Sequence, residues 1–170
     1  MKILIICTID ASFADRENVL CGRLSRELEE LNYDVDVCYL PFKRDMLNAT
    51  EQIFAFSLVD TTRADALVTI GYPACFIPHK NEHKVSYLFD CYPEIHSSFI
   101  FRLHESKVDE RQQIIKKITI AEENAFRNIK HIFVATDKLQ SEIYNRYNIA
   151  TNLLRSEDVN FTERVERALF

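Results

Sequence analysis

The feature that most constrains this chain is a regular alternation of short apolar runs with longer amphipathic stretches. The runs expected to be strands are 3–7, 33–41, 66–73, 84–89, 131–136 and 151–156. The stretches expected to be helices are 15–31, 45–60, 108–128, 137–144 and 160–169. Strands that alternate with helices in this way pair in parallel through right-handed crossovers. The pattern therefore predicts a doubly wound α/β domain with a mostly parallel sheet.

Individual residues set the expected ends and buried sides of these elements. Ser12 or Asp15 is expected to cap the first helix, and Pro41 is expected to end the second strand. Capping boxes are expected at two later helix starts, from Asp137 with Gln140 and from Asn160 with Glu163. The apolar sides of the first two helices are expected to contain Leu20, Leu24, Leu28, Leu31, Ile53, Phe54, Phe56, Leu58 and Val59.

Length and composition indicate an ordinary globular domain. The chain has 170 residues, of which 47% are apolar and 28% charged, as expected for one soluble domain with its own core. Its five cysteines are odd in number and show no C-x-x-C spacing, which favours a reducing cytoplasm. The apolar run at 3–7 is too short for the core of a signal peptide, and no stretch has the length of a membrane span.

Charge is distributed unevenly along the chain. The formal net charge of −5 gives no support for binding to nucleic acid. Basic residues nevertheless gather in one region, interrupted by a few acidic ones: Arg102, Lys107, Arg111, Lys116, Lys117, Arg127 and Lys130. Two interpretations remain open, a solvated helix face and a shallow site for an anionic ligand or a phospholipid surface.

Ligands of doubly wound sheets bind beyond the carboxyl ends of the strands, which selects four candidate segments. These segments are 8–13, 71–78, 90–96 and 136–138. The chain has only two glycines, Gly22 and Gly71, and neither follows the first strand. Because a dinucleotide turn uses glycine to bring backbone close to pyrophosphate, NAD, FAD and P-loop nucleotides are not expected, and no cofactor is predicted.

Several residues of the ligand types that zinc prefers lie within these segments: Cys75, His79, His83, Cys91 and His96. Pro73 and Pro78 argue against a continuous helix that would align the first three. The sequence therefore favours ordinary loop residues, and no metal site is predicted.

Three segments of the chain, taken in order, resemble a known enzyme family. They are "MKILIICTID" with "LSRELEELNYDVDVCYL", then "ACFIPHKNEHKVSYLF", and finally "EENAFRNIKHIFVATDKLQSEIYNRYNIATNLLR". They are similar to the N-terminal half of GT-B glycosyltransferases, especially glycosyltransferase family 4. The third segment is the most specific, because helix, strand, hydroxyl-bearing turn and short helix follow in the family's order.

The resemblance implies a Rossmann-like, acceptor-side domain over residues 1–170 of an enzyme that uses nucleotide-sugars. In such enzymes the active site lies between two domains, and the second domain binds the donor. That second half lies outside this chain. The expected partners are therefore a sugar acceptor and a donor-binding domain or subunit, with weak membrane-surface association and homo-oligomer formation as further possibilities.

The resemblance also selects site residues. Relatives often place histidine just after the fourth strand, where this chain has Asp90, so Asp90 is the expected catalytic position. The loop after the first strand lacks the glycine that relatives usually have there. The residues expected to contact the acceptor are Asp10, Ser12, Tyr72, Tyr92, Glu94, Thr136 and Lys138. Carboxylates accept hydrogen bonds from sugar hydroxyls, and aromatic rings stack on sugar faces.

A second hypothesis comes from a different class of function. The chain can instead be a non-catalytic α/β binding or assembly module that holds a partner protein on the same exposed edge. For neither hypothesis is a complete transferase reaction by this chain alone expected.

Overall fold

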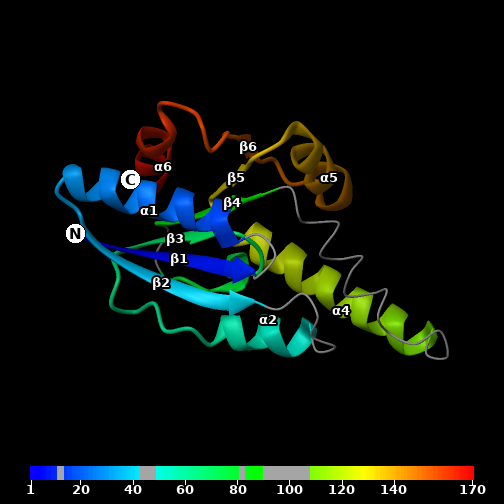
Figure 1. The fold of residues 1–170 in the computed structure, drawn as a ribbon. Coiled ribbons are helices and arrows are strands. Elements are labelled where there is room, and N and C mark those ends of the chain that lie inside the picture. Colours follow the sequence, from blue (N-terminus) through cyan, green and yellow to red (C-terminus); the bar gives the residue numbers. More distant parts are fainter. Residues whose placement is uncertain (11–13, 43–48, 81–82, 90–107) are drawn as a thin grey trace.

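The computed structural model describes residues 1–10, 14–42, 49–80, 83–89 and 108–170 (Figure 1). Its six strands form one sheet in the order β2-β1-β3-β4-β5-β6, and every neighbouring pair is parallel. Helices cover both faces of this sheet. The predicted doubly wound, Rossmann-like α/β fold is therefore confirmed, and the sheet of the described residues is entirely parallel.

The elements follow one another in the expected alternation. The strands are β1 Lys2–Asp10, β2 Asp34–Phe42, β3 Ala66–Ile70, β4 Lys84–Leu88, β5 His131–Val134 and β6 Asn152–Leu153. The helices are α1 Ala14–Glu30, α2 Ala49–Ser57, the 3-10 turn η1 Ala74–Phe76, α4 Val108–Arg127, α5 Asp137–Tyr147 and α6 Phe161–Leu169. Every residue of β3 and β4 is buried, because both faces of these two strands are covered.

The helices form two layers. In Figure 1, α1 lies above the sheet while α2 and α4 lie below it. The side chains of α1 and α6 pack together on one face, and those of α2, η1, α4 and α5 pack on the other. α6 also contacts α1 directly, since Thr162 Oγ1 donates to Glu27 Oε2 over 2.5 Å. Beyond the ends of these two helices, the rings of Tyr33 and Phe170 stack at 5.6 Å. The last helix thus covers part of the first one.

Pro41 does not end the second strand, so that prediction is wrong. β2 continues to Phe42, and Pro41 pairs in register with Ile9 of β1. β2 lies at the edge of the sheet, with β1 as its single neighbour among the described strands. Proline lacks the backbone N–H, and an edge strand tolerates that loss because one side of it needs no ladder hydrogen bond.

The expected buried sides of the first two helices are partly wrong. Leu20, Leu24 and Leu28 are buried as predicted, but Leu31 lies beyond the end of α1 and is 48% exposed. On α2, Ile53 and Phe56 are buried and Phe54 is 63% exposed, while Leu58 lies just beyond the end of α2 and is 67% exposed. The buried side of α2 is therefore one narrow stripe, because only one side of this short helix faces the sheet.

The predicted helix caps also need correction. Asp15 lies inside α1 and so does not cap it, and Ser12 lies outside the described residues. Thr136, not Asp137, is the N-cap of α5, and its Oγ1 accepts a hydrogen bond from the Leu139 N–H over 3.2 Å. Asn160 does precede α6, but its side chain makes no capping hydrogen bond.

Candidate functional site

The strand order places a topological switch point between β1 and β3. From β1 the chain passes through α1 to β2 on one side, and it then returns through α2 to β3 on the other side. The two connections leave β1 in opposite directions, which opens a crevice at the carboxyl ends of these strands. This is the place where the fold itself favours a ligand.

The floor of this crevice is a tight contact between the ends of β1 and β3. Gly71 follows β3 with a φ of +85°, and a Cβ atom built on it would lie 2.7 Å from Thr8 Oγ1. The Thr8 hydroxyl donates to the Ile70 carbonyl oxygen over 3.0 Å, which fixes its position. The same Cβ atom would lie 3.7 Å from Glu17 Cγ. Glycine is therefore required here both by its φ and by the space available.

Arg16 and Glu17 stand above this floor in the first turn of α1. Glu17 is only 6% exposed, and its Oε1 lies 3.5 Å from Arg16 Nη2. The Arg16 guanidinium also lies 4.2 Å from the centre of the Phe89 ring, just after β4. A buried carboxylate and an aromatic face thus hold one guanidinium at the carboxyl edge. Neither residue was predicted from the sequence, where both looked like ordinary polar positions of an amphipathic helix.

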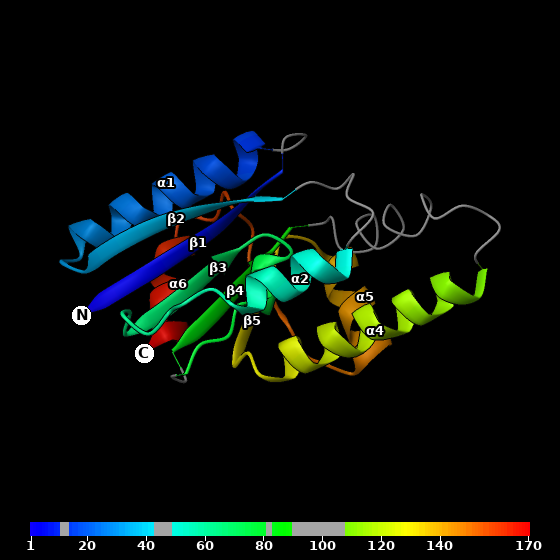
Figure 2. The same cartoon turned by 90° about the horizontal axis from the view of Figure 1, so that it is seen from below.

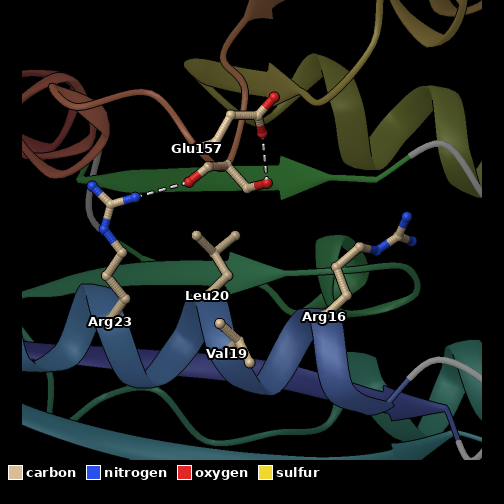
Figure 3. Close-up of a pocket in the computed structure, with 6 residues that line it drawn as sticks. Arg16, Val19, Leu20, Arg23 and Glu157 are labelled. Atoms are coloured by element: carbon tan, nitrogen blue, oxygen red, sulfur yellow. Dashed lines mark hydrogen bonds between the residues drawn. The ribbon is translucent and has the colours of Figure 1, made fainter.

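A hollow of about 510 Å³ runs along α1 from this point (Figure 3). Its lining residues are Arg16, Val19, Leu20, Arg23, Ser156 and Glu157. In Figure 3 the two arginines stand at opposite ends, with Leu20 and Val19 between them. The floor is therefore apolar and the ends are cationic, which suits a ligand with polar groups around a less polar body.

Arg23 plays a structural part in this hollow. Its Nη1 and Nη2 donate to the carbonyl oxygens of Ser156 and Asp158 over 2.9 and 3.2 Å. Its Nε donates to Glu27 Oε1 over 2.7 Å. These bonds fix the segment between β6 and α6 against α1, so Arg23 has a structural role in this hollow.

Four of the eight predicted site residues have a described backbone position. Asp10 ends β1, Tyr72 follows β3, Thr136 caps α5 and exposed Lys138 lies in its first turn. The positions after β5 are separated from those after β3 by β4, which corresponds to about 10 Å across the sheet. The other predicted residues, Ser12, Asp90, Tyr92 and Glu94, lie outside the described residues.

Tyr72 turns into the core and away from the crevice. It is 8% exposed, and its hydroxyl donates a short hydrogen bond to Oε1 of Glu122 on α4. Tyr147 at the end of α5 donates to Oε2 of the same carboxylate over 2.6 Å. Glu122 is fully buried, so this group joins the end of β3 to two helices. Its position indicates a structural role for Tyr72.

Two buried cysteines, Cys7 and Cys75, are poorly suited to nucleophilic catalysis. A hydrogen bond with the Cys21 thiol and burial raise the pKa of Cys7, which therefore stays protonated. Burial likewise raises the pKa of the Cys75 thiol in η1. Cys7 and Cys75 thus behave as small apolar side chains. The hydrogen bond with Cys7 lowers the pKa of the Cys21 thiol.

The residues considered as zinc ligands have other partners. The ring Nδ1 of His79 lies 3.2 Å from Thr61 Oγ1, and Nδ1 of His83 lies 2.5 Å from the Leu169 carbonyl oxygen. Cys75 is fully buried in η1, while Cys91 and His96 lie outside the described residues. Within the part of the chain that the structure describes, no three His, Cys, Asp or Glu side chains are grouped as metal ligands.

The basic region around α4 is only partly described. Lys116 and Lys117 are exposed on α4, and Arg127 pairs with Glu123 over 2.8 Å. Glu122 belongs to the buried side of the same helix. Among the described helices, none combines the length and apolarity that are needed to cross a lipid bilayer.

Comparisons with known proteins place the chain in no family. No protein-family model matches it, and a search of curated proteins gives no match. Function must therefore be argued from the residues themselves and from the resemblance described above.

Proposed function

We propose that this chain is the acceptor-side domain of a GT-B glycosyltransferase that uses nucleotide-sugars. The observation that carries the proposal is the hollow along α1, which Arg16 lines at one end, where its guanidinium lies beside Glu17 and Phe89. This hollow has the volume of a small-molecule site and an apolar floor with polar ends. The resemblance to glycosyltransferase family 4 supplies the chemistry, because that family's N-terminal domain holds the acceptor.

In this proposal Arg16 is the principal described contact to the acceptor. Its guanidinium has several N–H donors, and these suit sugar hydroxyls as well as an anionic substituent of the acceptor. Glu17 holds the guanidinium in place from a buried position. Asp90, at the proposed catalytic position, would complete one wall with Asp10, Ser12, Tyr92 and Glu94. Thr136 Oγ1 already caps α5, so Lys138 is the more available group beyond β5.

The proposed reaction needs a second half that binds the donor. The acceptor-side domain orients the nucleophilic hydroxyl, and a donor-binding domain or subunit supplies the activated sugar. We therefore expect no sugar transfer by this chain alone. We also propose a cytoplasmic location, which is supported by the four free cysteines of the described residues.

An NMR titration with a panel of sugars and nucleotide-sugars tests this proposal. Acceptor-type sugars should shift the amide signals of Thr8, Arg16 and Gly71. Arg16→Met should weaken this binding by about tenfold, because charge-assisted hydrogen bonds are lost. Arg26→Met is the matched control, since Arg26 is an exposed arginine on the same helix and should leave binding unchanged.

Two results would contradict the proposal. Tighter binding of nucleotide-sugars than of any free sugar would show that this chain is not the acceptor side. The absence of any sugar-dependent shift at the switch point would favour the alternative, a non-catalytic binding or assembly module. The exposed side chains of Phe54 on α2 and of Leu58 just after it support that alternative, because large exposed apolar side chains often mark protein contacts.

A further inference from the structure

A second candidate site lies at the amino ends of the strands, around Lys84 at the start of β4. Lys84 is only 7% exposed. Its Nζ donates to the carbonyl oxygens of Cys75 and Ile77, over 2.9 and 2.6 Å. No ion pair with a carboxylate of the described residues neutralises it. A buried ammonium without a counter-charge is costly, so this position needs an explanation.

The hydrogen-bond capacity of Lys84 is not exhausted by these two carbonyl groups. An ammonium group has three N–H donors, and two of them have an acceptor. Burial lowers the pKa of Lys84 to about 8, so the side chain still carries a proton near neutral pH. One donor and one positive charge therefore remain for a further partner.

Lys84 lines a hollow of about 400 Å³ with two other basic residues, His79 and Lys80. The hollow has no acidic lining residue among those described. Phe76, Pro78 and Ala125 supply apolar walls. The lining thus combines cationic and apolar groups, as a small organic anion requires.

His79 is held in a fixed orientation at this hollow. The Thr61 hydroxyl donates to the Pro78 carbonyl oxygen over 3.0 Å, so it can only accept from His79 Nδ1. Burial and the nearby Lys84 charge lower the pKa of His79. A bound anion would oppose both effects, because it would favour the protonated imidazole.

At the end of α4 that borders the hollow, polar groups already form hydrogen bonds within the chain. The carbonyl oxygens of Asn124 and Ala125 already accept from the backbone N–H of Asn128, over 3.3 and 3.2 Å. The Asn128 side-chain amide donates to the Asn124 carbonyl oxygen as well, over 2.9 Å. These bonds satisfy the helix end that borders the hollow, and Lys84 remains the dominant charge.

We propose that this hollow binds a small phosphorylated compound through its phosphate group, with Lys84 as the central contact and Lys80 at the rim. A compact ammonium acts as a point charge and suits a tetrahedral oxyanion, whereas flat carboxylates are better matched by the planar fork of arginine. The site lies at the amino ends of the strands, away from the switch point. It is therefore independent of the function proposed above.

Competitive acetylation of the intact protein tests the proposal. The protein is treated with limiting acetic anhydride, and modification of each lysine is measured by mass spectrometry. Glycerol phosphate and inorganic phosphate should each protect Lys84 by about tenfold relative to chloride at equal ionic strength. Lys138, an exposed lysine at the other edge of the sheet, should be modified equally in all three solutions.

Variants separate binding from folding. Lys84→Met should abolish phosphate binding measured by calorimetry, but it also removes the donor to two carbonyl groups. Lys80→Met changes only an exposed side chain, and it should weaken phosphate binding several-fold while the thermal midpoint without ligand stays unchanged. Equal protection of Lys84 by acetate would overturn the assignment to phosphate. Absence of protection, or unchanged binding by both variants, would overturn the site itself.

Discussion

The two faces of the sheet are built from different chemistry. Under α1 and α6 the core is mainly apolar, with Leu24, Leu28 and Val165 fully buried, and it also contains the buried carboxylate of Glu17. Its best-defined polar group is the hydroxyl of Tyr87, which donates to the Leu154 carbonyl oxygen over 2.9 Å. This face is held mainly by area removed from water, and such burial depends on volume more than on direction.

The opposite face, under α2, α4 and α5, contains buried polar groups that need particular partners. Thr69 and Ser86 share a hydrogen bond of 2.6 Å between β3 and β4. Glu122 accepts from two tyrosine hydroxyls, and Lys84 donates to two carbonyl groups. These interactions are directional, so removing one partner leaves another polar group buried without a bond.

The two faces of the domain should therefore respond differently to substitution. The apolar face can be repacked with residues of similar volume, whereas the polar face is sensitive to single atoms. The polar face also carries the hollow at Lys84 and a groove of about 440 Å³ between α2 and α4, which lie side by side in Figure 2. The apolar face, which also carries the hollow along α1, thus depends mainly on volume, whereas the polar face depends on specific hydrogen-bond partners.

The largest effect is expected from Glu122→Ala. This change leaves the hydroxyls of Tyr72 and Tyr147 buried without their shared acceptor, which should lower the free energy of unfolding by about 3–5 kcal/mol. Denaturant unfolding measures the change. The matched control is Glu123→Ala, whose carboxylate pairs with Arg127 at the surface and should cost less than about 0.5 kcal/mol. Similar costs for both variants would remove the distinction between the faces.

On the apolar face, Leu24→Ala should lower the free energy of unfolding by about 3 kcal/mol, through lost burial and the cavity that remains. Leu24→Met keeps the volume and should cost less than about 1.5 kcal/mol. The same unfolding experiment measures both. If Leu24→Met were as damaging as Leu24→Ala, this face would be as specific as the other one.

A pH dependence should distinguish the polar face. The folded pKa of Lys84, about 8, lies below the ordinary value of 10.5. Below pH 8 both the folded and the unfolded chain hold this proton, whereas between pH 8 and 10.5 the unfolded chain binds more protons. Stability should therefore rise with pH in this window, by about 2–3 kcal/mol from this group. Unfolding curves of Lys84→Met should lack that rise, and equal slopes would contradict the prediction.

The smallest effect is expected from single hydroxyl deletions. Tyr72→Phe and Tyr147→Phe should each lower the free energy of unfolding by about 1–2 kcal/mol, since one hydrogen bond to a carboxylate is lost. Because both hydroxyls share Glu122, the double variant should deviate from additivity by about 0.5 kcal/mol or more. Strict additivity in a double-mutant cycle would show that the two hydroxyls act independently.

Much of the fold could be predicted because the spacing of apolar residues along the sequence reflects which side chains are buried. Continuous apolar runs gave β3 and β4, which are buried on both faces, and leucines at helical spacing gave α1. The wrong predictions concern residues whose environment depends on their position in the tertiary structure. Pro41 is tolerated because β2 is an edge strand, and Leu31 is exposed because α1 ends just before it. Neither fact can be read from local sequence.

The candidate site was harder to predict because it depends on contacts between distant residues. Gly71, just after β3, contacts Thr8 of the neighbouring strand β1, and Arg16 of α1 contacts Phe89 just after β4. A usable signal did exist for Glu122. It lies four residues after Ile118 and four before Phe126, which are both buried, so helical spacing places it on the buried side of α4.

The packing of α6 against α1 has a consequence for how the chain folds. The hydrogen bond between Thr162 and Glu27 joins residues 135 positions apart, and Tyr33 contacts the chain end in the same way. Contacts of such long sequence separation raise the loop-closure entropy that must be overcome before the core is complete. During synthesis the part of α1 that contacts α6 stays uncovered until α6 has formed. The apolar face should therefore be the last part of the core to close, and its transient exposure makes it the part most open to chaperones.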